Sequence, residues 1–189
     1  MRGKRLIYSI GLMLSRGGHR RAEYLRKHHI FAHMGTGCTF QRRKIPLYPE
    51  LISIGNNVHF ASNVSFLTHD VTHLMLNRMG GVQQHEKIGC IEIGDNVFVG
   101  AGTRILYDVR IGSNVIIGTG STVTKDIPDN SIAAGSPAKV IGSFDDYLKK
   151  RETEESYPKE LRPVNQEVSS ELAEWCWKRF KEKRNDTVE

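Results

Sequence analysis

Residues 93–128 read IGDNVFVGAGTRILYDVRIGSNVIIGTGSTVTKDIP, and an aliphatic residue returns in this stretch at every sixth position. The residues of this series are Ile93, Val99, Ile105, Ile111, Ile117 and Val123. A helix would space its apolar residues three and four apart, and a half-buried strand would alternate in twos. A six-residue period therefore predicts a chain that turns after each short strand.

Two further positions of the repeat are regular. The fifth position of each unit holds Val97, Thr103, Val109, Val115, Ser121 and Ile127, and glycine follows the aliphatic residue at Gly94, Gly100, Gly112 and Gly118. Fixed-period repeats are typical of solenoids, in which each unit buries its apolar residue only against the neighbouring units. Three hexapeptides would make one triangular coil with a small residue at each corner. The alternative, a β-sandwich with coincidental glycines, does not explain the period.

The repeat and the segment VTKDIPDNSIAAGSPAKVIG at 123–142 resemble the hexapeptide-repeat acyltransferases, whose fold is a left-handed parallel β-helix. The segment FLTHD at 66–70 is similar to the Thr-His-Asp bacterial acetyltransferases of surface-polysaccharide synthesis, and less closely to the maltose and galactoside O-acetyltransferases. The resemblance covers about residues 20–142. It implies an all-β solenoid that assembles as a homotrimer with the cofactor groove between subunits.

We expect three parts: an N-terminal helical cap at 1–33, the left-handed β-helix catalytic domain at 34–142, and a C-terminal helical extension at 143–189. The six-residue period is weak from Met34, is lost between Arg42 and Leu51, and is regular again from Ile54. It stops at about 70–87, so we expect a loop that leaves the solenoid there. Loops longer than about 15 residues are uncommon and often functional.

The N-terminus predicts two helices, at 4–15 and at about 19–30, with Gly17 and Gly18 ending the first. The second is basic and amphipathic, and two interpretations stay open. It caps the open end of the solenoid, which we favour because terminal repeats need covering, or it docks on an anionic membrane surface. The opening run is interrupted by Tyr8, Ser9 and Gly11 and leads into more arginine, which disfavours a secretory signal.

The C-terminal extension carries two helix starts. Ser143 followed by Asp146 has the pattern of an N-cap and an acidic third residue, and Ser169 can cap a last helix. The apolar stripe of that last helix consists of Leu172, Trp175, Cys176 and Phe180. We expect this stripe to pack against the solenoid or a neighbouring subunit rather than bind a cofactor.

The 189 residues carry 27 lysines and arginines against 21 aspartates and glutamates, a net charge of +6. Such a balance favours a phosphorylated cofactor, nucleic acid or an anionic membrane surface as partner. Nucleic acid is disfavoured, because the basic residues are not interleaved with stacking aromatics. The three cysteines, Cys38, Cys90 and Cys176, are odd in number and widely spaced, so a disulfide framework is not expected and a cytoplasmic, reducing location is the simpler interpretation.

His69 is the predicted catalytic residue. It lies where the repeat breaks, and acyl transfer to a hydroxyl needs a base that takes up a proton near neutral pH. In the resembling enzymes the catalytic histidine falls at this position. The other interpretation is a corner histidine that bonds to backbone carbonyls. Asp70 would orient the imidazole, bind the acceptor or serve as a turn residue, and His73 is a candidate acceptor contact at a position where relatives often have small residues.

Coenzyme A would account for part of the basic character, because its phosphates attract lysine and arginine. The resemblance implies cofactor contacts at Ala101, Thr119, Thr124, Lys125 and Lys139. Solvated surface charge is the other interpretation for the two lysines. Gly142 stands where some relatives have a basic residue, so fewer phosphate contacts are expected.

The leading hypothesis is an acetyl-CoA-dependent O-acetyltransferase that acts on a sugar hydroxyl of a bacterial surface polysaccharide or its precursor by direct transfer. The alternatives are N-acetylation of an amino sugar and a non-catalytic basic scaffold that binds an anionic polymer or membrane. A zinc hydratase is disfavoured, because a catalytic zinc needs three ligands and the histidine pattern of the gamma-class carbonic anhydrases is missing. We therefore expect no metal.

Overall fold

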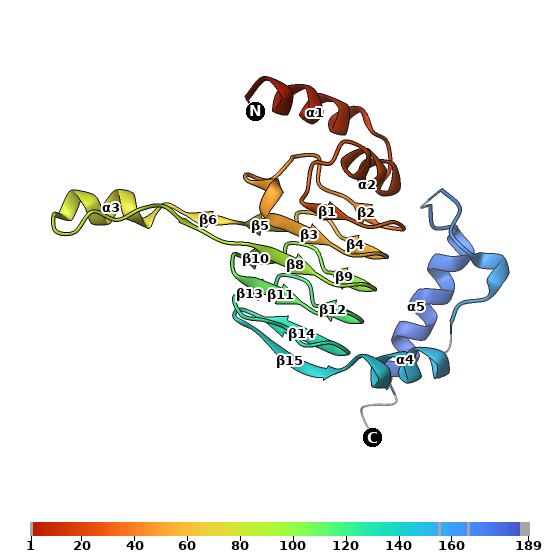
Figure 1. Cartoon of the computed structure of the whole chain (residues 1–189). Helices are drawn as coiled ribbons and strands as arrows, with labels where there is room; N and C mark the ends of the chain where they lie inside the picture. Colours follow the sequence, from red (N-terminus) through yellow and green to blue (C-terminus); the bar gives the residue numbers. More distant parts are fainter. Residues whose placement is uncertain (1, 155, 166, 186–189) are drawn as a thin grey trace. The chain divides into compact units, whose positions relative to one another are not determined.

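The computed structural model describes residues 2–154, 156–165 and 167–185 (Figure 1). The chain divides into two compact units, Met1–Leu148 and Lys149–Glu189. The first unit holds a stack of short strands, two N-terminal helices and an arm that projects from the stack (Figure 1). The repeat region therefore lies entirely within one unit.

The strands of the stack form three sheets that the chain visits in rotation. The first sheet orders β1 (His33–Met34), β3 (Ile52–Ile54), β8 (Ile91–Ile93) and β11 (Val109–Ile111). The second orders β2 (Thr39–Phe40), β4 (Val58–Phe60), β9 (Val97–Val99), β12 (Val115–Ile117), β14 (Ser131–Gly135) and β15 (Ala138–Ser143). The third orders β5 (Ser65–Leu67), β10 (Arg104–Leu106) and β13 (Thr122–Val123).

Every pairing in these sheets is parallel except that of β14 with β15, which is antiparallel. Within one coil the chain runs through one strand of each sheet, as in β8, β9 and β10, and the next coil repeats the order. The antiparallel β15 ends the parallel run. The prediction of stacked three-sided coils is thus confirmed at the level of sheet order and register.

The six-residue period marks the interior. All six residues of the aliphatic series are at most 2% exposed. The fifth-position series is buried too, including the polar Thr103 and Ser121. Each of these hydroxyls donates to the carbonyl of Gly118, at 3.2 Å from Thr103 and 2.6 Å from Ser121. A small polar residue is therefore tolerated inside because its hydroxyl is satisfied locally.

Asparagines form a second regular feature, at the corners of the coils. Asn57, Asn96, Asn114 and Asn130 all have a positive φ of 54° to 56°. Asparagine adopts this left-handed conformation more readily than most residues. Each side-chain amide donates to the next at 2.9 Å, from Asn57 to Asn96, on to Asn114 and then to Asn130. This ladder holds the corners of successive coils in register.

Helices α1 (Arg2–Leu14) and α2 (Gly18–Lys27) lie at the first-coil end of the stack (Figure 1). Leu12, Ala22 and Leu25 join the buried core. Arg21 is also buried, and its guanidinium donates to the carbonyl of Phe40 at 2.7 Å and to Gln41 Oε1 at 2.7 Å. Burial lowers the pKa of this guanidinium. The expected break between the helices is present, but Gly18 begins α2 instead of ending α1.

The irregular stretch that the sequence shows between Arg42 and Leu51 contains one short element, the 3-10 helix η1 (Pro49–Leu51). Proline at its first position suits a helix start, because proline has no N–H to leave unpaired. The preceding residue, Tyr48, takes the left-handed conformation with φ 49° and ψ 54°. This stretch joins β2 to β3 and brings Tyr48 to the site described below.

The segment at 70–87 leaves the solenoid, but it is not the irregular loop that the sequence predicts. It forms an arm from β6 (His69–Asp70), α3 (Thr72–Met79) and β7 (Lys87–Ile88), in which β6 and β7 pair antiparallel. No residue of α3 is buried. The helix escaped sequence analysis because its apolar residues do not alternate with a polar face.

Helix α4 (Phe144–Thr153) begins in the first unit and ends in the second. The second unit also contains the 3-10 helix η2 (Lys159–Leu161) and α5 (Ser170–Asn185). Both predicted caps are confirmed: Ser143 Oγ accepts from the N–H of Asp146, and Ser169 Oγ accepts from the N–H of Leu172, each at 3.2 Å. Within this unit the rings of Tyr157 and Trp175 meet edge to face. The surface that the apolar stripe of α5 covers stays a prediction.

The buried series gives a direct stability test. Replacing Ile111 by alanine leaves a cavity between coils, and we expect the free energy of unfolding to fall by about 2–5 kcal/mol. The matched control is Ile141→Ala, whose side chain is 67% exposed and whose loss we expect to cost less than about 0.5 kcal/mol. Urea unfolding followed by circular dichroism measures both. Equal effects of the two substitutions would contradict the inward orientation of the series.

Candidate active site

The candidate site is built where the third sheet ends and the arm begins. Thr68 follows β5, is fully buried, and donates its hydroxyl to the carbonyl of Leu47 at 2.8 Å. Its own carbonyl accepts from the N–H of Gly89 at 3.0 Å, where the arm returns. The two limbs of the arm are therefore held together where His69 begins the outgoing limb.

His69 is half-buried at the base of the arm. Its Nδ1 atom is buried and has no hydrogen-bond partner among the residues that the structure describes. Its ring meets the ring of Tyr48 edge to face, with centroids 5.2 Å apart and planes at 77°. An imidazole that is held by packing, with a ring nitrogen not committed to the protein, is available to exchange a proton with a substrate.

Tyr48 is a contact of His69 that sequence analysis missed. A bulky residue in the left-handed region is an outlier, and such strain tends to occur at functional sites. Its hydroxyl donates to the carboxylate of Glu86, with oxygen distances of 3.3 and 3.5 Å. Burial, and next the charge of Glu86, raises the pKa of the Tyr48 phenol, so it stays protonated as the donor. The residue thereby ties the returning limb of the arm to His69.

Asp70 is held by donors other than the imidazole. Its Oδ1 accepts from the hydroxyl of Thr72 at 2.6 Å and from the N–H of Thr72 at 3.1 Å, and its Oδ2 accepts from the hydroxyl of Tyr107 at 2.6 Å. The Thr72 hydroxyl and next the Tyr107 hydroxyl lower the pKa of the Asp70 carboxyl from 3.8 to about 2. The carboxylate therefore both turns the chain into α3 and joins the arm to the next coil.

Tyr107 follows β10, one coil beyond the strand that leads to Thr68, because Leu67 pairs with Leu106. The hydrogen bond to Asp70 raises the pKa of its phenol. The Lys87 ammonium lies 4.8 Å from the centroid of its ring. Tyr107, Asp70 and Lys87 thus form a polar cluster next to His69. Aligning the repeat of one coil with that of the next in the sequence would have placed Tyr107 beside Thr68. No sequence pattern points to Tyr48 or Glu86.

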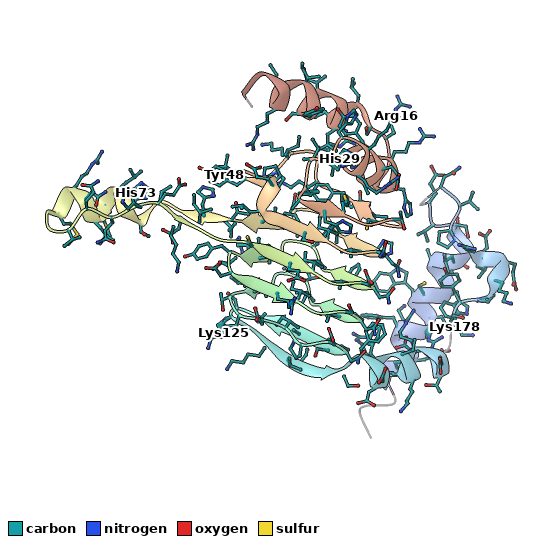
Figure 2. All side chains as sticks on the ribbon, viewed as in Figure 1. Arg16, His29, Tyr48, His73, Lys125 and Lys178 are labelled. Atoms are coloured by element: carbon teal, nitrogen blue, oxygen red, sulfur yellow. The ribbon has the colours of Figure 1, made fainter. Side chains whose placement is uncertain are left out.

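Three further histidines lie on the arm or on the second sheet. His73 is half-buried on α3, out along the arm (Figure 2), and its Nδ1 also has no partner in the described residues. His85 is exposed. His59 lies on β4, where its ring bonds to Thr39 at 3.0 Å and to Asn57 at 2.9 Å. Across residues 2–154, 156–165 and 167–185, no three histidine, cysteine or acidic residues converge as metal ligands.

Four of the five predicted cofactor residues lie just before or just after strands of the third sheet, and the fifth, Lys139, lies on the second sheet. Ala101 and Thr119 occupy the corner before β10 and β13, and the N–H of Gly120 donates to the carbonyl of Ala101 at 2.8 Å. Thr124 and Lys125 follow β13 directly and are exposed. Figure 2 shows Lys125 on the side of the stack from which the arm projects. Lys139 is exposed on β15, paired with Ala134. Ala101 and Thr119 thus lie at the start of strands of the third sheet, and Thr124 and Lys125 lie at the end of one.

A family model described as bacterial transferase hexapeptide (six repeats) matches residues 90–125. Protein CapG of Staphylococcus aureus is 40% identical over 161 residues, which cover 80% of this chain and 85% of CapG. The chain belongs to the hexapeptide-repeat transferase family. A galactoside O-acetyltransferase of Lactococcus lactis is 41% identical to this hexapeptide-repeat transferase over 117 residues, 60% of the chain and 54% of that enzyme.

Solved structures agree with this membership. A maltose O-acetyltransferase from Clostridium difficile 630 is 29% identical with a TM-score of 0.54, and the match covers 75% of this chain and 85% of that one. A galactoside acetyltransferase in complex with coenzyme A is 27% identical with a TM-score of 0.56, over 89% of this chain and 90% of that one. This hexapeptide-repeat transferase is therefore similar to sugar acetyltransferases along most of its length.

The Asp70 cluster predicts how the arm responds to acid. Because the folded-state pKa is lowered, the ionised carboxylate stabilises the fold above pH 3.8, and this contribution is lost as the pH falls toward 2. Thr72→Val removes the strongest donor and should raise the Asp70 pKa more than Tyr107→Phe does. Titration of the carboxyl carbon by NMR measures the midpoint, and the other carboxyls of each sample serve as the control. An unchanged Asp70 midpoint in both variants would refute the cluster.

Proposed function

We propose that this protein is an acetyl-CoA-dependent O-acetyltransferase that acts on a sugar hydroxyl of a bacterial surface polysaccharide or its precursor. The observation that carries the proposal is the position of His69. It lies at the break of a hexapeptide solenoid, half-buried, packed against Tyr48, and with an unpaired ring nitrogen. Similarity to galactoside and maltose O-acetyltransferases supports the sugar acceptor.

In the proposed reaction the imidazole of His69 takes the proton of the acceptor hydroxyl as its oxygen attacks the thioester carbonyl. The C–S bond then breaks, and the departing coenzyme A sulfur receives the proton from the imidazolium. General-base catalysis of this kind contributes about 10²- to 10⁴-fold. Backbone N–H groups near the site would stabilise the oxyanion. Tyr48 acts as a positioning residue, since it contacts the ring of His69 and not the reacting atoms.

The donor would lie along the third sheet, between the corner of Ala101 and Thr119 and the edge that carries Lys125. Small residues at the first corner suit a narrow pantetheine arm, and an exposed ammonium suits a phosphate. The galactoside acetyltransferase with bound coenzyme A covers most of this chain, which supports the same donor here. Thr124 and Lys139 are the further proposed contacts, and Asp70 and His73 are proposed acceptor contacts.

Three finer features complete the proposal. We infer a left-handed coil from the family resemblance, and a homotrimer in which a neighbouring subunit supplies part of the donor groove. We place the reaction in the cytoplasm, where acetyl-CoA is made. The exposed apolar residues of the arm, including Leu74, Met75 and Met79, are compatible with burial in an assembly.

The first test is acetyl-CoA turnover, measured as free thiol released against a panel of sugars, amino sugars and oligosaccharides. We expect a hydroxyl acceptor to stimulate release in the wild type. His69→Ala should lower that rate about 10²- to 10⁴-fold while coenzyme A binding is kept.

The matched control is His85→Ala, which removes an exposed histidine of the same arm and should keep full activity. Stimulation by amino sugars alone would assign N-acetylation instead. A wild type that neither binds coenzyme A nor releases thiol would refute the proposal.

Lys125 gives a second test, at the level of binding. Loss of one charge-assisted contact to a phosphate should weaken coenzyme A affinity about tenfold in Lys125→Ala. Isothermal titration calorimetry measures this, with Lys181→Ala, an exposed lysine of α5, as the control. Repeating the titration with 3′-dephospho-coenzyme A shows which phosphate the lysine contacts. Equal affinities of wild type and Lys125→Ala for both ligands would remove Lys125 from the site.

A further inference from the structure

Helix α1 presents its apolar residues to solvent. Five of its large hydrophobic side chains are more than half exposed: Leu6 at 65%, Ile7 at 66%, Ile10 at 51%, Met13 at 59% and Leu14 at 75%. At 100° per residue these positions fall within about a third of the helix circumference. They form one continuous stripe, which we call the α1 stripe. Such a stripe on a surface helix normally faces a core.

The orientation of α1 is fixed by its other face. Leu12 is fully buried in the core of the solenoid, and the partly buried Tyr8 packs against that core. The guanidinium of Arg5 donates to the carbonyls of Ile45 and Pro46, each at 3.0 Å. The helix cannot rotate to bury the α1 stripe without losing these contacts. The stripe is therefore available to a partner outside the subunit.

Charge identifies the chemistry of that partner. Residues 1–49 hold eleven lysines and arginines against one acidic residue, Glu23, while residues 50–189 hold sixteen against twenty. The carboxylate of Glu23 is itself paired with Arg26 at 2.7 Å. The excess of positive charge is thus confined to the end of the chain that carries the α1 stripe. A partner for this surface is anionic.

Basic side chains lie close to the α1 stripe itself. Arg16 lies two residues beyond the end of the helix and is exposed (Figure 2). Arg43 is also exposed, and its guanidinium donates to the carbonyl of Met13 at 3.3 Å, which places it at the C-terminal end of α1. Lys44 is exposed next to it in the chain. One surface therefore carries both an apolar stripe that can enter an apolar phase and basic side chains that can contact phosphate groups.

We propose that the α1 stripe docks this protein on the surface of an anionic lipid bilayer. An interfacial helix inserts its apolar face to about the headgroup boundary while flanking basic residues contact anionic lipid headgroups. The helix would lie in the plane of the surface, since no described helix is long and apolar enough to cross a bilayer. A second copy of this chain fits the charge less well, because it would bring the same basic surface into contact. The proposal is independent of acetyl transfer.

Cosedimentation of the full chain with vesicles tests the proposal. We compare vesicles of phosphatidylcholine alone with vesicles that contain a third of phosphatidylglycerol, and expect binding to the second only. A tenfold rise in salt should weaken it, because the exposed charges are screened. The double variant Ile10→Ser with Met13→Ser should bind about tenfold more weakly or worse. Its matched control, Val164→Ser with Val168→Ser, removes two exposed aliphatic side chains elsewhere and should bind like the wild type.

A charge variant keeps the test decisive if the apolar variant folds poorly. Arg16→Gln with Lys44→Gln should also weaken binding, by about thirtyfold, because two basic residues near an anionic surface contribute about 1 kcal/mol each. Lys149→Gln with Lys181→Gln changes the net charge equally and should have no effect. Circular dichroism confirms that each variant is folded.

Two results would overturn the proposal. One is a wild type that does not bind anionic vesicles. If, in addition, the apolar variant has a lower molar mass in solution than the wild type, the stripe is assigned to contacts between copies. The other is binding that neither variant weakens.

Discussion

The structure depends on the burial of one aliphatic residue in every six inside a narrow three-sided stack. Coils can stack closely only where the corner residue leaves space for the neighbouring backbone. At Gly100 a Cβ atom would lie 2.5 Å from the backbone nitrogen of Thr119. At the next corners the asparagine ladder supplies the left-handed conformation and a hydrogen bond to the adjacent coil. The aliphatic period and the corner residues are thus parts of one constraint.

The candidate site arises where this constraint is relaxed. After β5 the chain leaves the stack, forms the arm, and returns at Gly89, so the two limbs lie beside each other at His69. The arm is not attached by backbone pairing alone. Tyr107 on the next coil donates to Asp70, and Tyr48 on the connection between β2 and β3 donates to Glu86. These two bonds come from residues on both sides of His69 in the stack. A regular solenoid therefore gives a fixed base to a histidine that lies outside the repeat.

The fold could be predicted from the sequence where a residue's role depends on the repeat or on its neighbours in the chain. The inward series, the stacking into three sheets, the break at His69 and the caps at Ser143 and Ser169 follow from spacing and local hydrogen bonding. Tyr48 and Glu86 could not be found, because their contact depends on a left-handed residue in an irregular stretch and on the path of the arm. Helix α3 was missed because its apolar residues do not gather on one face at helical spacing. Helix α1 was predicted from its sequence, but the sequence did not show which of its faces is exposed.

The account predicts one spatial relation above all, that the donor thioester meets the imidazole of His69 at the end of the third sheet. A crystal structure with coenzyme A bound tests this directly. We expect the pantetheine arm to run along β5, β10 and β13, with its sulfur next to the ring of His69 and a phosphate at Lys125. Coenzyme A bound at another face of the stack, with His69 remote from the sulfur, would contradict the account.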